Sequence, residues 1–153
     1  MKNIFEQDQQ WMAYALKLAE TGQQLGEVPV GAVIVFENQK IAQAWNQPIA
    51  TNDPTAHAEI VAIRQAGCFL GNYRLLNTTL YVTLEPCLMC IGAIIHSRIQ
   101  RLVFATTDPK RGAVCSALQL SNLSFLNHQV IWQQGILEIE CSQLLQNFFK
   151  ARR

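Results

Sequence analysis

The chain has 153 residues, 50% of them hydrophobic, and a formal net charge of +1. This length and apolar content suit one domain, residues 1–153, with a single core. The balanced charge gives no overall sign of a nucleic-acid-binding protein. The longest uncharged apolar stretch, residues 87–95, is too short to cross a bilayer, and Glu6 and Asp8 interrupt the segment where a secretion signal would lie. We therefore expect a cytoplasmic protein without a membrane segment.

Hydrophobic periodicity predicts strands that alternate with helices. Apolar side chains at helical spacing indicate helices, and short runs rich in valine and isoleucine indicate buried strands. In chain order the pattern predicts a helix at 5–22, strands at 29–36 and 40–46, a loop at 48–54, a helix at 55–67, a strand at 78–83, a helix at 86–96, strands at 99–105 and 130–133, and a helix at 138–151. This order predicts an α/β protein, a three-layer α/β/α sandwich around a central mixed five-stranded sheet. The strand, helix and strand of the second half favour a parallel pair.

Two of the predicted helices begin with recognisable end signals. Thr55 is placed to cap the exposed amides of the helix at 55–67. Pro86 suits the first turn of the helix at 86–96, because proline has no amide hydrogen that would stay unpaired there.

The five cysteines are an odd number, and Cys87 and Cys90 are the one closely spaced pair. In a reducing compartment this spacing indicates a metal or redox site, not a disulfide framework. Cys68 and Cys141 lie in apolar helical patterns and are expected to be inert core residues. Cys115 lies in a loop-like stretch and receives no role.

Three potential metal ligands lie at the starts of two predicted helices. Cys87 and Cys90 are one helical turn apart, so their sulfur atoms can converge, and His57 precedes Cys87 by 87 − 57 = 30 positions. One imidazole and two thiolates are three ligands for a tetrahedral zinc ion, whose fourth position stays open to water. The positive end of a helix also stabilises thiolates. We expect the two helix ends to face each other across the ion.

Glu59 is a carboxylate two residues from His57 that the ion does not need as a ligand. Side chains in a first helical turn lean toward the N-terminus, so Glu59 and His57 can both reach the space in front of the helix. A metal-activated water beside a free base indicates hydrolysis. A closed structural site needs four protein ligands, and neither His96 nor His128 has ligand-like spacing to the other three.

Together these motifs resemble the cytidine/deoxycytidylate deaminase superfamily, and within it the bacterial deaminases that act on adenosine in transfer RNA. The resemblance covers nearly the whole chain. Beyond the zinc ligands, it includes segments 27–33, 45–48, 53–59, 72–75, 78–87, 96–99 and 148–153.

The resemblance implies a cytidine deaminase-like fold and hydrolytic conversion of adenosine to inosine at the wobble position of a tRNA anticodon. It implies one Zn²⁺ per subunit, an anticodon stem-loop as partner (normally of an arginine tRNA) and a homodimer. By position, zinc would be bound by His57, Cys87 and Cys90, and Glu59 would transfer protons. The base would be contacted by the Asn46 side chain and the Ala58 backbone and walled by Val28 and Pro29, while Asp108 and Lys110 would contact the RNA. Independently of the resemblance, the aromatic ring of Phe149 beside basic side chains is expected to stack with an RNA base.

Several interpretations stay open at this point. Asn46 also suits a turn at the end of a strand, and burial is expected for at least one of Phe148 and Phe149. Residues 20–26 have fewer basic side chains than the family often shows, so the sequence does not predict phosphate contacts from that segment. The same metal chemistry would serve a deaminase of a free base or nucleoside such as guanine or cytidine. A zinc-stabilised subunit that binds tRNA without editing it is the non-enzymatic alternative, and Glu59 argues against it.

Overall fold

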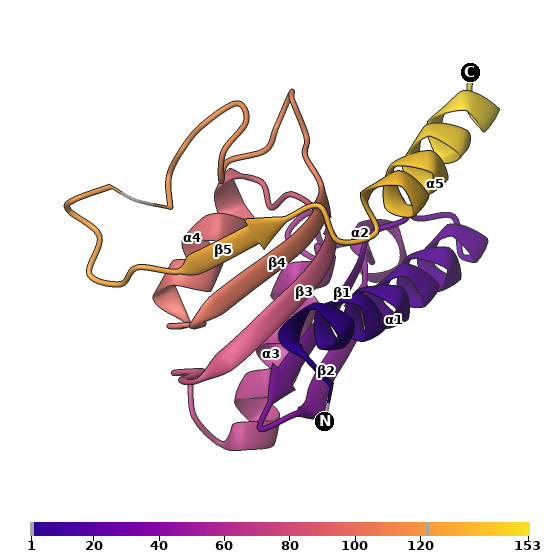
Figure 1. Ribbon diagram of the computed structural model, residues 1–153. Coiled ribbons are helices and arrows are strands. Elements are labelled where there is room, and N and C mark those ends of the chain that lie inside the picture. Colours follow the sequence, from indigo (N-terminus) through magenta and orange to yellow (C-terminus); the bar gives the residue numbers. More distant parts are fainter. Residues whose placement is uncertain (1, 122) are drawn as a thin grey trace.

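One mixed five-stranded sheet lies between two layers of helices (Figure 1). The computed structural model describes residues 2–121 and 123–153. Its elements in chain order are α1 (Ile4–Gln24), β1 (Gly31–Phe36), β2 (Gln39–Trp45), α2 (Pro48–Thr51), α3 (Ala58–Leu70), β3 (Thr78–Leu84), α4 (Leu88–His96), β4 (Arg101–Thr106), β5 (Ile131–Gln134) and α5 (Glu138–Ala151). The predicted sandwich and mixed sheet are confirmed.

The strand order β2-β1-β3-β4-β5 combines two kinds of pairing. β1 pairs antiparallel with β2 and β3, whereas β3 pairs parallel with β4, and β4 with β5. The crossover through α4 explains the parallel β3–β4 pair, as the sequence predicts. Leu84 at the end of β3 lies opposite Thr106 at the end of β4. The segments that follow these two strands therefore begin side by side at one edge of the sheet.

The two helical layers cover opposite faces of the sheet. α3 and α4 pack on one face, where Ala58, Ala62 and Ala66 recur every fourth residue and are all fully buried. α1 packs on the other face through residues that include Met12 and Ala15, and the start of α5 joins this layer (Figure 1). Since small alanines line the inner side of α3, this helix can lie close to the sheet.

The β1–β2 hairpin turns at Glu37 and Asn38, whose φ angles of 51° and 61° are both left-handed. Positive φ at both central residues is typical of the two-residue type I′ turn, whose twist matches that of the flanking strands. At the opposite end of β1, a Cβ on Gly31 would lie 2.0 Å from the Ala15 carbonyl oxygen of α1. Glycine is therefore required there for α1 to lie against the hairpin.

Three predicted features near the helix starts are wrong in detail. α3 begins at Ala58, three residues later than predicted, because the Thr55 backbone amide and hydroxyl both donate to Asp53 Oδ1, at 2.9 and 2.7 Å. Thr55 thus closes a turn instead of capping the helix. The predicted loop at 48–54 contains the short helix α2, and α4 begins at Leu88, so Pro86 lies outside it.

The predicted burial of two cysteines is half right. Cys141 is buried, but Cys68 is exposed. Cys68 follows the buried Ala66 by two positions, and residues two apart in a helix point roughly 200° away from each other.

Within residues 2–121 and 123–153, none of the helices has both the length and the apolar character to span a membrane.

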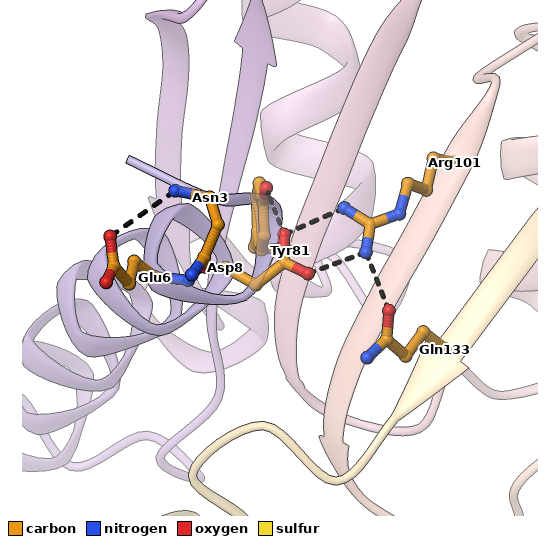
Figure 2. A network of polar contacts seen from close by, with 6 residues as sticks. All are labelled: Asn3, Glu6, Asp8, Tyr81, Arg101 and Gln133. Carbon is orange, nitrogen blue, oxygen red and sulfur yellow. Dashed lines mark hydrogen bonds and ion pairs between the residues drawn. The ribbon is translucent and has the colours of Figure 1, made fainter. Parts of the chain in front are cut away.

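A buried carboxylate links α1 to three strands of the sheet. Asp8 is 1% exposed, and its Oδ1 accepts hydrogen bonds from the Tyr81 hydroxyl at 2.8 Å and from Arg101 Nη1 at 2.7 Å. Its Oδ2 accepts from Arg101 Nη2 at 2.6 Å, and Nη2 also donates to Gln133 Oε1 (Figure 2). Burial, followed by the bond to Asp8, raises the pKa of Tyr81 above its ordinary value. The network joins α1 to β3, β4 and β5.

We expect Asp8→Asn to lower the free energy of unfolding by about 3 kcal/mol, because Arg101 would keep its charge and lose its ionic partner. Urea denaturation followed by circular dichroism measures the change. Glu20→Gln, an exposed substitution on the same helix, is the control and should change the stability by less than about 0.5 kcal/mol. Equal stability of the two variants would contradict the structural role of the network.

Candidate metal centre and active site

The N-termini of α3 and α4 supply the candidate metal ligands. His57 is the N-cap of α3 and Cys87 is the N-cap of α4, and both have extended backbone, with ψ of 154° and 178°. Cys90 lies in the first turn of α4 and is fully buried. The expectation that two helix ends meet at the metal site is therefore confirmed by the geometry.

The distances between the ligand atoms suit a tetrahedral zinc ion. His57 Nδ1 lies 3.6 Å from Cys87 Sγ and 3.5 Å from Cys90 Sγ, and the three ligand atoms lie within 4.8 Å of one another. Zinc bonds of about 2.3 Å to sulfur and about 2.0 Å to nitrogen, at tetrahedral angles, place sulfur and nitrogen about 3.5 Å apart. In the described part of the chain this is the one group of at least three side chains arranged for a metal. The donor set and its spacing therefore fit zinc.

The two cysteines differ in their readiness to ionise. A hydrogen bond from the Cys90 thiol, reinforced by His57, lowers the pKa of Cys87 to about 4. The same bond and burial raise the pKa of Cys90. The interaction with Cys87 also raises the pKa of His57. A thiolate at Cys87 is the form that ligates a metal.

Glu59 lies in the first turn of α3, beside the ligands but outside the ligand group. It is 5% exposed, and its small exposed surface contributes to the lining of a cleft together with His57 and Cys87. Burial, assisted by the charge of Cys87, raises the pKa of Glu59 to about 7, whereas His57 acts in the opposite direction.

The cleft has a volume of about 780 Å³ and brings together residues from distant parts of the chain. Its rim includes the basic side chains of Lys110, Arg111 and Arg153. Eight of the eleven residues predicted for the site contribute to its lining. These are Val28, Asn46, His57, Glu59, Cys87, Asp108, Lys110 and Phe149.

The predicted role of Pro29 as a wall of the base pocket stays a prediction. Pro29 is buried and is not among the residues that line the cleft, whereas Val28 and Val30 both line it. The Val30 amide donates to the Val28 carbonyl at 2.9 Å, so the chain makes a tight turn centred on Pro29 between these two residues.

Asn46 joins two sides of the cleft. Its Oδ1 accepts a hydrogen bond from the Ala58 backbone amide at 2.9 Å, and its Nδ2 donates to the Val28 carbonyl at 3.2 Å. Ala58 is fully buried. The Ala58 backbone amide thus donates to Asn46, and the expected contact between the Ala58 backbone and the base stays a prediction. Asn46 retains a second amide hydrogen and a second oxygen lone pair for a ligand.

The rim loop, residues 107–116, follows β4, and its residues 107–111 line one side of the cleft. Asp108 Oδ1 accepts hydrogen bonds from the backbone amides of Lys110 at 3.1 Å and Arg111 at 3.2 Å. Asp108 therefore shapes the turn that exposes Lys110 and Arg111, a function that the sequence reasoning did not predict.

Glu85 also lines the cleft and was missed by the sequence reasoning. It is 2% exposed and accepts hydrogen bonds from the rim loop. Burial alone would raise the pKa of this carboxyl, but hydrogen bonds from Cys115, Ser116 and neighbouring amides lower it below its ordinary value. In the sequence, the position of an acidic residue between an apolar strand and Pro86 could have identified Glu85 as a candidate site residue.

The two phenylalanines of α5 have different environments, as the sequence predicts. Phe148 is 6% exposed and Phe149 is 49% exposed, and their rings meet edge to face with centroids 5.3 Å apart. Phe149 lines the cleft, whereas Phe148 packs inside and lies under the Arg152 guanidinium, 4.2 Å from its ring centroid. An exposed aromatic ring therefore borders the cleft beside basic side chains.

Comparisons with known proteins agree with this geometry. The family described as cytidine and deoxycytidylate deaminase zinc-binding region matches residues 5–106. A tRNA-specific adenosine deaminase from Haemophilus influenzae is 52% identical, over 97% of this chain and 86% of that protein. Among solved structures, one from studies of A-to-I editing by tRNA:A34 deaminases has 42% identity and a TM-score of 0.87, covering 89% of this chain and 99% of that one.

A guanine deaminase from Bacillus subtilis is a more distant structural relative. It has 32% identity and a TM-score of 0.62, and the similarity covers 76% of this chain and 85% of that chain. The extent of these matches and the shared zinc-binding region lead to one assignment. The chain belongs to the zinc-binding cytidine and deoxycytidylate deaminase family, within the group of the bacterial tRNA-specific adenosine deaminases.

Proposed function

We propose that this protein converts adenosine to inosine by hydrolysis at the wobble position of a tRNA anticodon, with an arginine tRNA as the expected substrate. The observation that supports this function is the placement of a buried, unligated carboxylate beside a zinc site in a cleft with a basic and aromatic rim. The names of the relatives agree with this substrate. A tRNA substrate also implies a cytoplasmic location.

The reaction consumes water and releases ammonia. His57, Cys87 and Cys90 would hold a zinc ion, which would supply a water molecule of lowered pKa as the nucleophile at neutral pH. Glu59 takes a proton from this water and delivers it to a ring nitrogen of the adenine. The hydroxide oxygen adds to the carbon that bears the amino group. Glu59 then moves the remaining hydroxyl proton to that amino group, and the C–N bond breaks to release ammonia. The buried position of Glu59 beside the ligands suits this alternation between base and acid.

The purine enters the cleft between Val28 and the metal ligands. Val28 and Val30 supply an apolar wall, and Asn46 has one free donor and one free acceptor for the edge of the base. Because Ala58 and Val28 fix the Asn46 amide from two sides, its polar groups are oriented before the substrate binds. Such a preorganised contact reduces the entropy cost of binding.

The rim of the cleft suits an RNA hairpin loop. Lys110 and Arg111 can contact phosphates, and the exposed ring of Phe149 can stack with an unpaired base. A base in a hairpin loop is extruded at a lower cost than one inside a duplex, so it can reach the buried Glu59.

Substrate choice is tested by incubating the zinc-loaded protein with an arginine anticodon stem-loop, free adenosine, guanine and cytidine. We expect inosine in the RNA and no ammonia from the free compounds. The same stem-loop with its adenosine moved to the adjacent loop position is the matched control and should stay unmodified. Ammonia release from guanine or cytidine, without inosine in the RNA, would establish the alternative function as a free-base or nucleoside deaminase.

Glu59→Gln keeps the shape of the side chain and removes its ability to exchange protons. We expect kcat for inosine formation to fall by about 10³-fold or more, within the range for the loss of a general acid–base group. Zinc content, measured by mass spectrometry of the purified protein, should stay at one ion per chain. Glu37→Gln in the exposed hairpin turn is the control with unchanged activity. Normal turnover by the Glu59→Gln enzyme would refute the proton-transfer role.

We also propose that the protein forms a homodimer. Large apolar side chains are exposed beside the site, including Ile49 of α2 (70% exposed) and Leu88, which follows the ligand Cys87 (62% exposed). Exposed apolar groups of this size near a functional cleft are typical of surfaces that another molecule covers. Sedimentation equilibrium should give twice the chain mass of 17.2 kDa, and a species of 17.2 kDa at micromolar concentration would contradict the dimer.

A further inference from the structure

We propose that Glu85 is a positioning residue that fixes the rim loop (residues 107–116) in the shape that binds RNA. This inference rests on the proposed function, because it assigns the loop to substrate binding. Glu85 acts through the loop, and not on the reacting atoms.

The carboxylate of Glu85 accepts five hydrogen bonds, and every donor belongs to the rim loop. Oε1 accepts from the Asp108 amide at 3.0 Å and from the Ser116 hydroxyl at 2.5 Å. Oε2 accepts from the amides of Val114, Cys115 and Ser116 at 3.0, 2.9 and 3.1 Å. One side chain therefore holds both ends of the loop.

The loop encloses Glu85 so closely that one position has no room for a side chain. A Cβ on Gly112 would lie 2.3 to 2.5 Å from the carboxyl atoms of Glu85. Gly112 also donates its amide to the Asp108 carbonyl at 2.8 Å. Because Gly112 directly follows Lys110 and Arg111, contact with Glu85 determines where these two basic residues lie.

Glu85 also connects the loop to the catalytic framework. Its own amide donates to the Thr106 carbonyl at 2.9 Å, and Ala113 of the loop donates to the Pro86 carbonyl at 2.9 Å. The ligand Cys87 follows directly. The loop is thus attached to the segment that presents a zinc ligand, which sets the basic rim at a fixed place relative to the reacting centre.

A buried carboxylate can also stabilise a protein without any effect on substrate binding. Asp8 provides the matched comparison, because it is equally buried and hydrogen-bonded but lies on the α1 side of the sheet, within a network that includes no cleft-lining residue. Loss of Asp8 reports on stability alone, whereas loss of Glu85 should affect binding.

The test compares Glu85→Gln, Gly112→Ala and Asp8→Asn, each zinc-loaded and assayed with the anticodon stem-loop below its unfolding temperature. For Glu85→Gln and Gly112→Ala we expect KM to rise about tenfold, the equivalent of one lost charged hydrogen bond, and kcat to stay within about twofold. Ser116→Ala, which removes one donor, should raise KM less. Asp8→Asn should leave both constants unchanged.

The salt dependence supplies a readout that stability does not alter. Between about 50 and 200 mM salt the KM of the wild type should rise steeply, because basic residues release counterions from the phosphates. The slope of log KM against log salt concentration should be smaller in Glu85→Gln, where Lys110 and Arg111 no longer contact the RNA together. In Asp8→Asn this slope should be unchanged. A lower kcat at unchanged KM and unchanged slope would overturn the proposal.

Limited proteolysis tests the loop independently of RNA. Trypsin should cleave after Lys110 or Arg111 faster in Glu85→Gln and Gly112→Ala than in the wild type or Asp8→Asn. Equal cleavage rates would show that Glu85 does not fix the loop. If the wild type fails to edit the RNA, the proposed function fails instead, and the cleavage rates still decide whether Glu85 holds the loop.

Discussion

The site depends on the convergence of two helix N-termini that are thirty residues apart in sequence. His57 and Cys87 each occupy an N-cap position, where the backbone is extended and the side chain lies at the end of the helix. Both helices pack on the same face of the sheet, so their ends meet, and three ligand atoms lie within 4.8 Å. Helices hold such a ligand set more precisely than loops do.

The parallel pair β3–β4 determines what surrounds the metal centre. Parallel strands end at the same edge of the sheet, so the segment with Glu85 and Cys87 and the rim loop begin side by side. The ligands and the basic rim are therefore adjacent although they follow different strands. The antiparallel β1–β2 hairpin places Val28 and Asn46 at the opposite wall of the cleft. Because the sheet contains both a parallel and an antiparallel pair, both walls of the cleft lie beside the metal centre.

The sequence was sufficient for the layers, the mixed sheet and the meeting of His57, Cys87 and Cys90, because periodicity and ligand spacing are local signals. It failed where one hydrogen bond decides between local structures. Thr55 is a good helix cap by residue type, but Asp53 engages its amide and hydroxyl first. The burial of Cys68 was misjudged because the apolar pattern of α3 did not define its inner side. Glu85 was missed because its partners lie 23 to 31 positions away in sequence.

Two buried glutamates at the same cleft differ in the free energy of their charged forms. For Glu85, burial opposes ionisation, but five hydrogen bonds from the rim loop outweigh it and lower the pKa. For Glu59, burial prevails and the pKa rises to about 7. A carboxylate saturated with donors is a fixed anion around which a loop can be built. A carboxyl whose two protonation states have similar free energy near neutral pH can take up and release a proton. The two environments therefore give Glu85 a structural role and Glu59 a chemical role, although both residues are glutamates.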